Sequence, residues 1–263
     1  MAQFAPHYAT FTTINRIRAF SNFLFWAIFV LSLLDLVLPH DKPELLSTKI
    51  FEIGQIVNII FLISFFFSEG IVDLILVPIS DNKRRDDFLD NSIGSNLSLK
   101  QSVAYYDNDE VTQGLYKVAV NLFENCFFTH SLTKKLTVQK IIVPAIALIT
   151  IVVFAFFGFK QQPTFALSLL QLLFSTTLLG AVVKHLILLN RLNQIEQDWV
   201  TLFNNPDFKN NPSSKASLVY KYWLNYETLH SRIPADIPSK IYDKCNNDLT
   251  TQWTAIKRKY NIS

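Results

Sequence analysis

Four long apolar runs alternate with polar segments along the chain. They cover residues 19–38, 50–79, 141–159 and 164–183. A helix of about 20 apolar residues crosses the hydrocarbon core of a bilayer, which is about 30 Å thick. The pattern therefore predicts four transmembrane helices.

The connections between the runs predict that these helices form two hairpins. Residues 39–49 make a short polar connector, and residues 160–163 leave room only for a hairpin turn. The second run is too long for one straight span. We expect a membrane helix over residues 50–67 and an amphipathic extension that ends near Pro78. Two alternatives remain open, namely a re-entrant second run and a soluble hairpin over residues 141–183.

The polar segments also carry helical patterns. After the fourth run, apolar residues recur at helical spacing, and a loop over residues 204–212 ends that helix. In the central polar region, residues 107–110 form a cap and an acidic start, which predict a helix that places four apolar residues on one face. The tail, residues 213–263, reads as two or three short helices, with Pro234 and Pro238 between them. The two apolar stripes are Leu186, Leu189, Leu192, Ile195 and Trp199, and Leu115, Val118, Leu122 and Cys126.

These elements together predict an all-α integral membrane protein. Its first transmembrane hairpin covers residues 1–79, and a helical insertion covers residues 80–140. The second transmembrane hairpin covers residues 141–190, and a helical tail covers residues 191–263.

Basic residues beside the runs predict the orientation, because the loops that face the cytoplasm are enriched in lysine and arginine. One side carries ten such residues close to the runs, and the connectors on the other side carry three. Both termini and the insertion are therefore expected in the cytoplasm, with the protein crossing the bacterial inner membrane several times. The first group is Arg16, Arg18, Lys83, Arg84, Arg85, Lys134, Lys135, Lys140, Lys184 and Arg191, and the second is Lys42, Lys49 and Lys160.

The composition narrows the classes of function. Only 17% of the residues are charged, against about 25% in soluble domains. The net charge of +3 is too small to predict direct nucleic-acid binding. Glycine is scarce, and we find no nucleotide-binding, hydrolase or metal-ligand motif. We therefore expect neither an enzyme nor a cofactor or metal site. Cys126 and Cys245 are far apart and read as reduced thiols, with a disulfide as the alternative.

Polar residues inside two of the runs are candidates for a membrane conduit. Glu52, Gln55 and Asn58 share one helix face, and Ser168, Gln171 and Ser175 do the same in the fourth run. Polar side chains at membrane depth usually face other helices or a water-filled path. They either line a conduit in an oligomer or bond across helices and hold the bundle together.

Two further groups are candidates for ligand binding. Lys83, Arg84 and Arg85 follow the second run and would suit a lipid or ligand phosphate. Alternatively, they only set the topology and precede a solvated helix. In the tail, aromatic residues stand beside bases, which predicts either a partner or nucleotide surface or ordinary core packing. The residues named for that surface are Tyr222, Trp223, Trp253 and Lys257.

The tail sequence carries a resemblance to a known group of proteins. An isoleucine–tyrosine turn at Ile241 and Tyr242 is followed by an Asn/Asp–Leu–Thr cap at residues 247–250, and Trp253 leads into a basic helix. With the overall layout, this resembles the four-span effectors of bacterial nucleotide-signalling antiphage defence systems. The sequence differs at Asn247, where that group commonly has proline. The stretches DNKRRDDFLDN and YYDND in the insertion are also similar to that group.

The resemblance implies an effector that disrupts the inner membrane during infection, and we expect it to act as a homo-oligomer. A cyclic nucleotide or a cytoplasmic defence protein would trigger it, and no catalytic residue is implied. One alternative is a membrane scaffold or adaptor that localises a soluble partner complex. The other is a small-molecule transporter, which the lack of repeats with broken helices disfavours.

Overall fold

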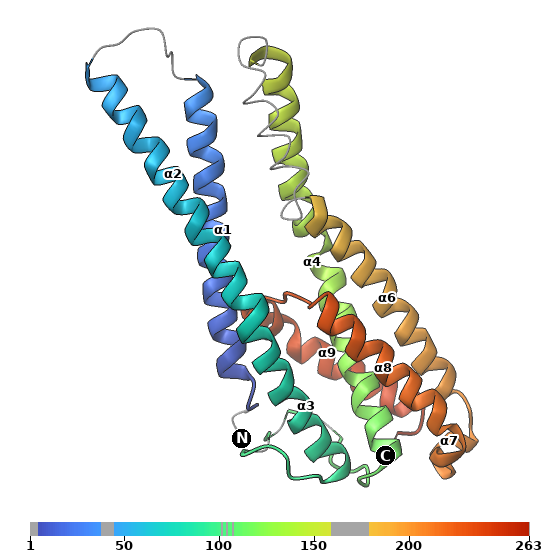
Figure 1. Ribbon diagram of the computed structural model, residues 1–263. Coiled ribbons are helices and arrows are strands. Elements are labelled where there is room, and N and C mark those ends of the chain that lie inside the picture. Colours follow the sequence, from blue (N-terminus) through green and yellow to red (C-terminus); the bar gives the residue numbers. More distant parts are fainter. Residues whose placement is uncertain are drawn as a thin grey trace. The chain divides into compact units, whose positions relative to one another are not determined.

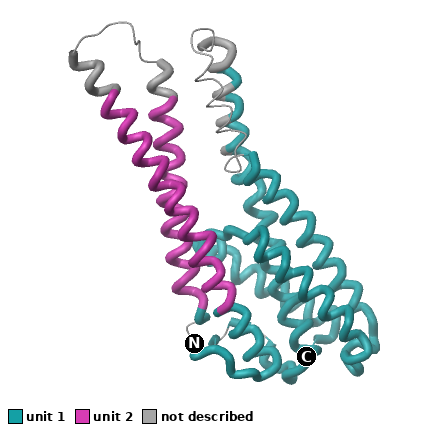
Figure 2. Tube along the Cα trace, viewed as in Figure 1, with its two compact units in different colours: residues 1–6, 83–154, 167–263 teal, residues 7–82, 155–166 magenta. Residues whose placement is uncertain are grey.

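The computed structural model describes residues 5–37, 45–100, 102–103, 105–106, 108–158 and 179–262. These residues form helices and loops and contain no β-strand, which confirms the all-α class (Figure 1). The chain divides into two compact units (Figure 2). Unit 1 comprises Met1–Pro6, Lys83–Phe154 and Leu167–Ser263, and unit 2 comprises His7–Asn82 and Ala155–Ala166.

Unit 2 is built on a hairpin of two long helices, α1 (Tyr8–Val37) and α2 (Leu45–Ile71). They run antiparallel, because Ser32 of α1 bonds to Asn58 of α2, whereas Arg18 bonds to Asp73 just beyond α2. Along α1, buried side chains recur three, four and seven residues apart, which is the spacing of a helix–helix seam. They include Ile14, Ser21, Leu24, Phe25 and Ile28.

The helix that begins with α2 does not end near Pro78, so that prediction is wrong. The chain passes through a π-helical turn, η1 (Val72–Leu76), into α3 (Val77–Ile93). In the π-turn the Val77 amide donates to the Val72 carbonyl, five residues back. Proline has no amide hydrogen, so Pro78 cannot donate a backbone hydrogen bond to the preceding turn. The π-turn widens the helix directly before Pro78, where that bond is absent.

Two helical stretches are long and apolar enough to cross a membrane, Tyr8–Ser32 and Glu52–Ile93. The most apolar window of the second has a mean hydropathy of 2.2, and only 6% of it is buried. It is therefore not a core helix of the kind that a soluble domain buries. The third predicted run, to residue 158, is helical within α4 (Leu115–Gly158). Most of the fourth lies outside the described residues, so four spans remain a prediction.

Unit 1 packs α4 against α6 (Leu179–Phe203), α8 (Ala216–Arg232) and α9 (Ser239–Lys259). Two short turns, α7 (Asp207–Asn210) and η2 (Pro212–Lys215), connect α6 to α8. The core is aromatic. Phe123 of α4 stacks on Phe203, at 5.3 Å between ring centroids, and meets the Trp253 ring edge-on at 5.4 Å.

Several local predictions for unit 1 are confirmed. Val118, Leu122 and Cys126 are buried in α4, although every residue from Lys117 to Glu124 is buried as well, so this part of the helix is covered on all sides. The tail forms two helices on either side of Pro234 and Pro238. The predicted helix start at residues 107–110 is wrong, because α4 begins at Leu115 after Gly114, whose φ is +142°. In α6 the buried stripe runs through Leu188, Leu192, Ile195, Trp199 and Leu202, and Leu186 is exposed.

Candidate functional site

The polar residues of the second apolar run point in two directions. Asn58 is half-buried, and its Nδ2 donates to Ser32 Oγ at 3.4 Å, inside the α1–α2 hairpin. Glu52 and Gln55 are exposed. The three residues predicted to share one face therefore have different environments. Asn58 joins the two helices of the hairpin, whereas Glu52 and Gln55 remain accessible. Ser168, Gln171 and Ser175 lie outside the described residues.

An ion pair closes the other end of this hairpin, at the π-turn. Arg18 Nη2 lies 3.3 Å from Asp73 Oδ1. The Asp73 side chain is 61% exposed, and exposed pairs of this kind contribute about 0–1 kcal/mol in water. The pair therefore contributes little to stability, but it shows which residues of α1 and of the π-turn lie at the same level.

Two of the three cations after the second run are held by a protein carboxylate. Arg84 Nη2 and Arg85 Nε lie 2.6 Å and 2.8 Å from the same Glu227 oxygen of α8. Burial alone would raise the pKa of Glu227, but the Arg84 charge and hydrogen bonds from both arginines outweigh it and lower the pKa. A phosphate at Arg84 and Arg85 would have to displace this carboxylate. Lys83 is exposed on α3.

The aspartates after these cations organise the loop that follows α3. Asp90 accepts hydrogen bonds from the amides of Leu97 and Ser98, at 2.6 Å and 2.8 Å, and from the hydroxyls of Ser95 and Ser98. Asp87 accepts a bond from the Ser102 amide at 2.7 Å. Among the described residues, no cluster of three His, Cys, Asp or Glu side chains could hold a metal. We therefore interpret these carboxylates as loop caps.

A buried polar network joins α3, the following loop, α4 and α9. The Asn108 side chain donates to Asn121 Oδ1 at 2.8 Å and to Glu124 Oε2 at 2.6 Å, and it accepts from Trp253 Nε1 at 3.2 Å. Asn121 in turn donates to Asn91 and Ser92 of α3. Asn108, Asn121 and Trp253 have no exposed surface. The network fixes one arrangement of these segments, because each of these buried groups has a partner.

The aromatic residues of the tail pack into the core of unit 1. Trp253 is fully buried, and its ring lies parallel to Phe127 at 6.3 Å between centroids. Tyr222 is buried and meets Trp199 edge-on at 5.2 Å. Trp223 is half-buried against Phe88. This is the geometry of core packing, the alternative to a surface on which bases stack.

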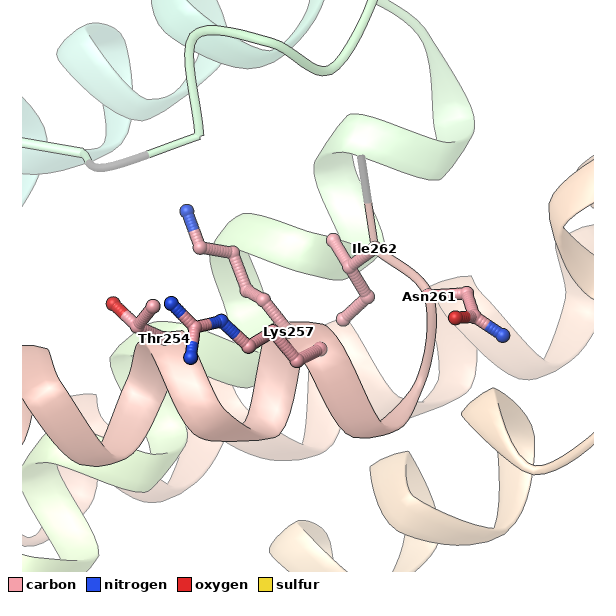
Figure 3. A pocket seen from close by; sticks show the side chains of 5 residues that line it. Thr254, Lys257, Asn261 and Ile262 are labelled. Atoms are coloured by element: carbon pink, nitrogen blue, oxygen red, sulfur yellow. The ribbon is translucent and has the colours of Figure 1, made fainter.

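A shallow pocket of about 380 Å³ lies at the end of α9 (Figure 3). Its lining offers an ammonium, a guanidinium, a hydroxyl and an amide. Lys257 Nζ also pairs with Glu110 Oε1 at 3.0 Å. The pocket could hold a small anion, but the C-terminal end of a helix carries partial negative charge. Lys257 and Arg258 therefore also stabilise the C-terminal end of α9. The lining residues are Thr254, Lys257, Arg258, Asn261 and Ile262.

The α4–α6 pair contains polar contacts that the sequence did not indicate. His130 Nδ1 lies 2.5 Å from Glu196 Oε2, and Thr137 Oγ1 lies 3.0 Å from His185 Nε2. Cys126 donates to the Leu192 carbonyl. The two helices are therefore neighbours along this length. A histidine and an acid on separate helices leave no local pattern that would reveal such a pair.

Both cysteines are free thiols, in agreement with the prediction from their spacing. Burial raises the pKa of the Cys126 thiol well above its ordinary value, and the carboxylates of Glu196 and Asp198 add to the shift. Cys126 is therefore expected to stay a protonated, unreactive thiol in the folded protein.

No family model matches the sequence, and neither a curated protein nor a solved structure shows significant similarity to the chain.

Proposed function

We propose that the protein is a membrane effector of antiphage defence. It oligomerises in the bacterial inner membrane and permeabilises or depolarises that membrane when its cytoplasmic part receives a nucleotide signal or binds a partner protein. The proposal is supported by the apolar surface of α2, by the polar residues within that surface and by the resemblance of the tail. Both termini are assigned to the cytoplasm on the charge distribution.

The exposed surface of α2 carries the membrane part of the proposal. Large aliphatic and aromatic side chains are exposed around much of its circumference. Soluble monomers rarely expose apolar patches larger than a few hundred Å². Hydrocarbon is the environment that suits such a helix. The exposed side chains include Ile53, Ile56, Ile59, Ile60, Ile63, Phe66 and Phe67.

Glu52 and Gln55 carry the oligomeric part. They are exposed among the isoleucines of α2, and polar groups at membrane depth are costly unless they are paired or hydrated. A neighbouring copy or a water-filled path would satisfy them. Asn58 donates to Ser32 through its amide nitrogen, and its Oδ1 is buried without a partner, so we assign Asn58 to the interior of the hairpin and not to its exposed face.

Two helices give a signal a physical route toward the membrane. The chain is helical from Leu45 to Ile93, from the apolar α2 to the polar end of α3. Likewise, α4 begins in the core of unit 1 and continues into the third apolar run. A signal received at the polar end of either helix would therefore act on a segment that continues directly into an apolar run.

Two measurements made in parallel test the proposal, one of the membrane potential and one of the oligomer mass. Potential-sensitive dye fluorescence is followed in cells that express the protein with its genomic neighbours during phage challenge. Light scattering after size exclusion in detergent gives the oligomer mass. We expect Gln55→Leu to abolish depolarisation and reduce the mass. Asn58→Leu serves as the matched control, which should retain the oligomer and weaken only the α1–α2 hairpin.

Three results would contradict the proposal. Protected cells that keep an unchanged potential would remove the effector function. A Gln55→Leu variant that matches the unsubstituted protein in mass and activity would remove the role of this face. Extraction by alkaline carbonate without detergent would remove the membrane assignment itself.

A scaffold or adaptor is the second candidate. Tyr220 and Leu224 are exposed four residues apart on α8, and they form an apolar spot that a soluble partner could cover. A stoichiometric partner that co-elutes in detergent, together with an absence of conductance in liposomes, would favour this function. Loss of that partner in Leu224→Ser, with an intact oligomer, would assign the spot.

A further inference from the structure

The α4–α6 pair carries a concentration of positive charge where its sequence changes from polar to apolar. We call this set the basic collar, and its members are Lys134, Lys135, Lys140, Lys184 and Arg191. We propose that the collar binds the phosphate headgroups of anionic phospholipids. The inference rests on the membrane insertion in the proposed function, and it adds the class of lipid and the residues that contact it.

Acidic residues are sparse on the two helices that carry the collar. They are Glu124 of α4 and Glu196 and Asp198 of α6, and Glu196 pairs with His130. Residues 129–158 of α4 and residues 179–195 of α6 contain no aspartate or glutamate. Lys134, Lys135, Lys184 and Arg191 are exposed. The cations after α2 differ in this respect, because Arg84 and Arg85 share the Glu227 carboxylate. The collar is therefore the better site for an external anion.

The register of the two helices brings the four lysines of the collar to similar heights, whereas Arg191 lies six residues, or about 9 Å, along α6 from His185. Thr137 contacts His185, the residue directly after Lys184. Lys134 and Lys140 each lie three residues, less than one helical turn, from Thr137. The six residues from Lys134 to Lys140 rise about 9 Å along the helix. The headgroup layer on each side of a bilayer is about 5–8 Å thick. Flexible lysine side chains reach over this difference.

Exposed aliphatic side chains lie directly beside the collar. On α4, Val138 stands between the lysines, and Ile142 and Ile146 follow them. On α6, Ile187 stands between Lys184 and Arg191. A phospholipid offers a phosphate to the cations and acyl chains to these side chains. A nucleic acid or an acidic protein segment would leave the aliphatic surface in water, so a lipid fits the surface better.

The test measures lipid binding by the full chain purified in a nonionic detergent. Phosphatidylglycerol or phosphatidylcholine is added to the micelles, and native mass spectrometry counts the lipids retained. The collar variant is Lys134→Gln, Lys135→Gln, Lys184→Gln. The control variant is Lys221→Gln, Lys240→Gln, Lys244→Gln, which removes the same charge from exposed positions on α8 and α9.

We expect phosphatidylglycerol to bind the unsubstituted and control proteins in preference to phosphatidylcholine. The collar variant should bind phosphatidylglycerol roughly a hundredfold more weakly, at about fivefold per lysine. Arginine at the same three positions should restore binding, which separates charge from misfolding. The inference would be overturned if the protein showed no preference for phosphatidylglycerol and a DNA oligonucleotide of equal charge displaced the bound lipid. The collar would then be assigned to a soluble polyanion.

Equal lipid binding by the collar and control variants would also overturn it. That failure is distinct from failure of the proposed function, because binding in micelles requires no depolarisation. A protein that resists carbonate extraction and depolarises cells, but shows no lipid preference, would refute the collar alone.

Discussion

Asn108 connects segments of unit 1 that are far apart in the chain, and its replacement by alanine tests that fold directly. The substitution removes three side-chain hydrogen bonds, one each with Trp253, Asn121 and Glu124. Water cannot replace them readily, because Asn108 has no exposed surface. The indole N–H of Trp253 and the amide oxygen of Asn121 would lose the Asn108 partner.

The magnitude follows from these orphaned groups. Each buried polar group left without a partner costs about 1–3 kcal/mol. We therefore expect Asn108→Ala to lower the free energy of unfolding by about 3–5 kcal/mol, above the usual range of about 0.5–3 kcal/mol for point mutations. For a unit of this size, 1 kcal/mol shifts Tm by about 2–4 °C. The expected loss is thus about 10 °C.

Thermal and urea unfolding in detergent, followed by tryptophan fluorescence, provide the assay. The emission of Trp253 should also change at low denaturant, because its indole loses a hydrogen bond. Asn247→Ala is the matched control on the exposed face of α9, and it should stay within about 0.5 kcal/mol. A loss below about 1 kcal/mol for Asn108→Ala, with unchanged emission, would refute the role given to the network.

Three further predictions follow from single contacts. Because the pKa of Glu227 is lowered from 4.5 in the folded state, its ionised form adds stability above about pH 4.5, and that stability is lost as the pH falls further. Glu227→Gln should therefore be destabilised at pH 7 and approach the unsubstituted protein in acid, as urea titrations at both pH values would show. Cys126 is buried with a raised pKa, so maleimide should label it only on unfolding, and rapid native labelling would contradict the packing. Asp73→Asn should cost less than about 1 kcal/mol, since the Asp73 side chain is 61% exposed; a larger loss in thermal unfolding would mean that the pair is buried in the membrane-bound protein.

The helical class and several boundaries were predictable because they depend on local patterns. Val118, Leu122 and Cys126 fall on one face of a helix through their spacing alone, and Pro234 and Pro238 mark the gap before α9 because prolines disfavour the preceding helical turn. The same rule failed at Pro78. There the π-turn provides the missing room, and no residue pattern in Val72–Leu76 announces it.

The contacts of the candidate site depend on residues far apart in the chain. Arg84 meets Glu227 across 143 positions, and Trp253 meets Asn108 across 145. From the sequence, Lys83, Arg84 and Arg85 form one cluster, and only the fold shows that two of them share a carboxylate. Likewise, helical spacing groups Glu52, Gln55 and Asn58 together. The antiparallel partner α1 determines that Asn58 alone is bonded within the hairpin.

The π-turn before Pro78 has a mechanical consequence. A π-turn holds one residue more than the α-helical turn it replaces. If Val72–Leu76 tightened into regular α-helix, the residues that follow it in the helix would shift by one position relative to α2. That step is a rotation of about 100° with a rise of about 1.5 Å. A small local change in winding would thus turn the residues that follow it about the helix axis, as a screw turns.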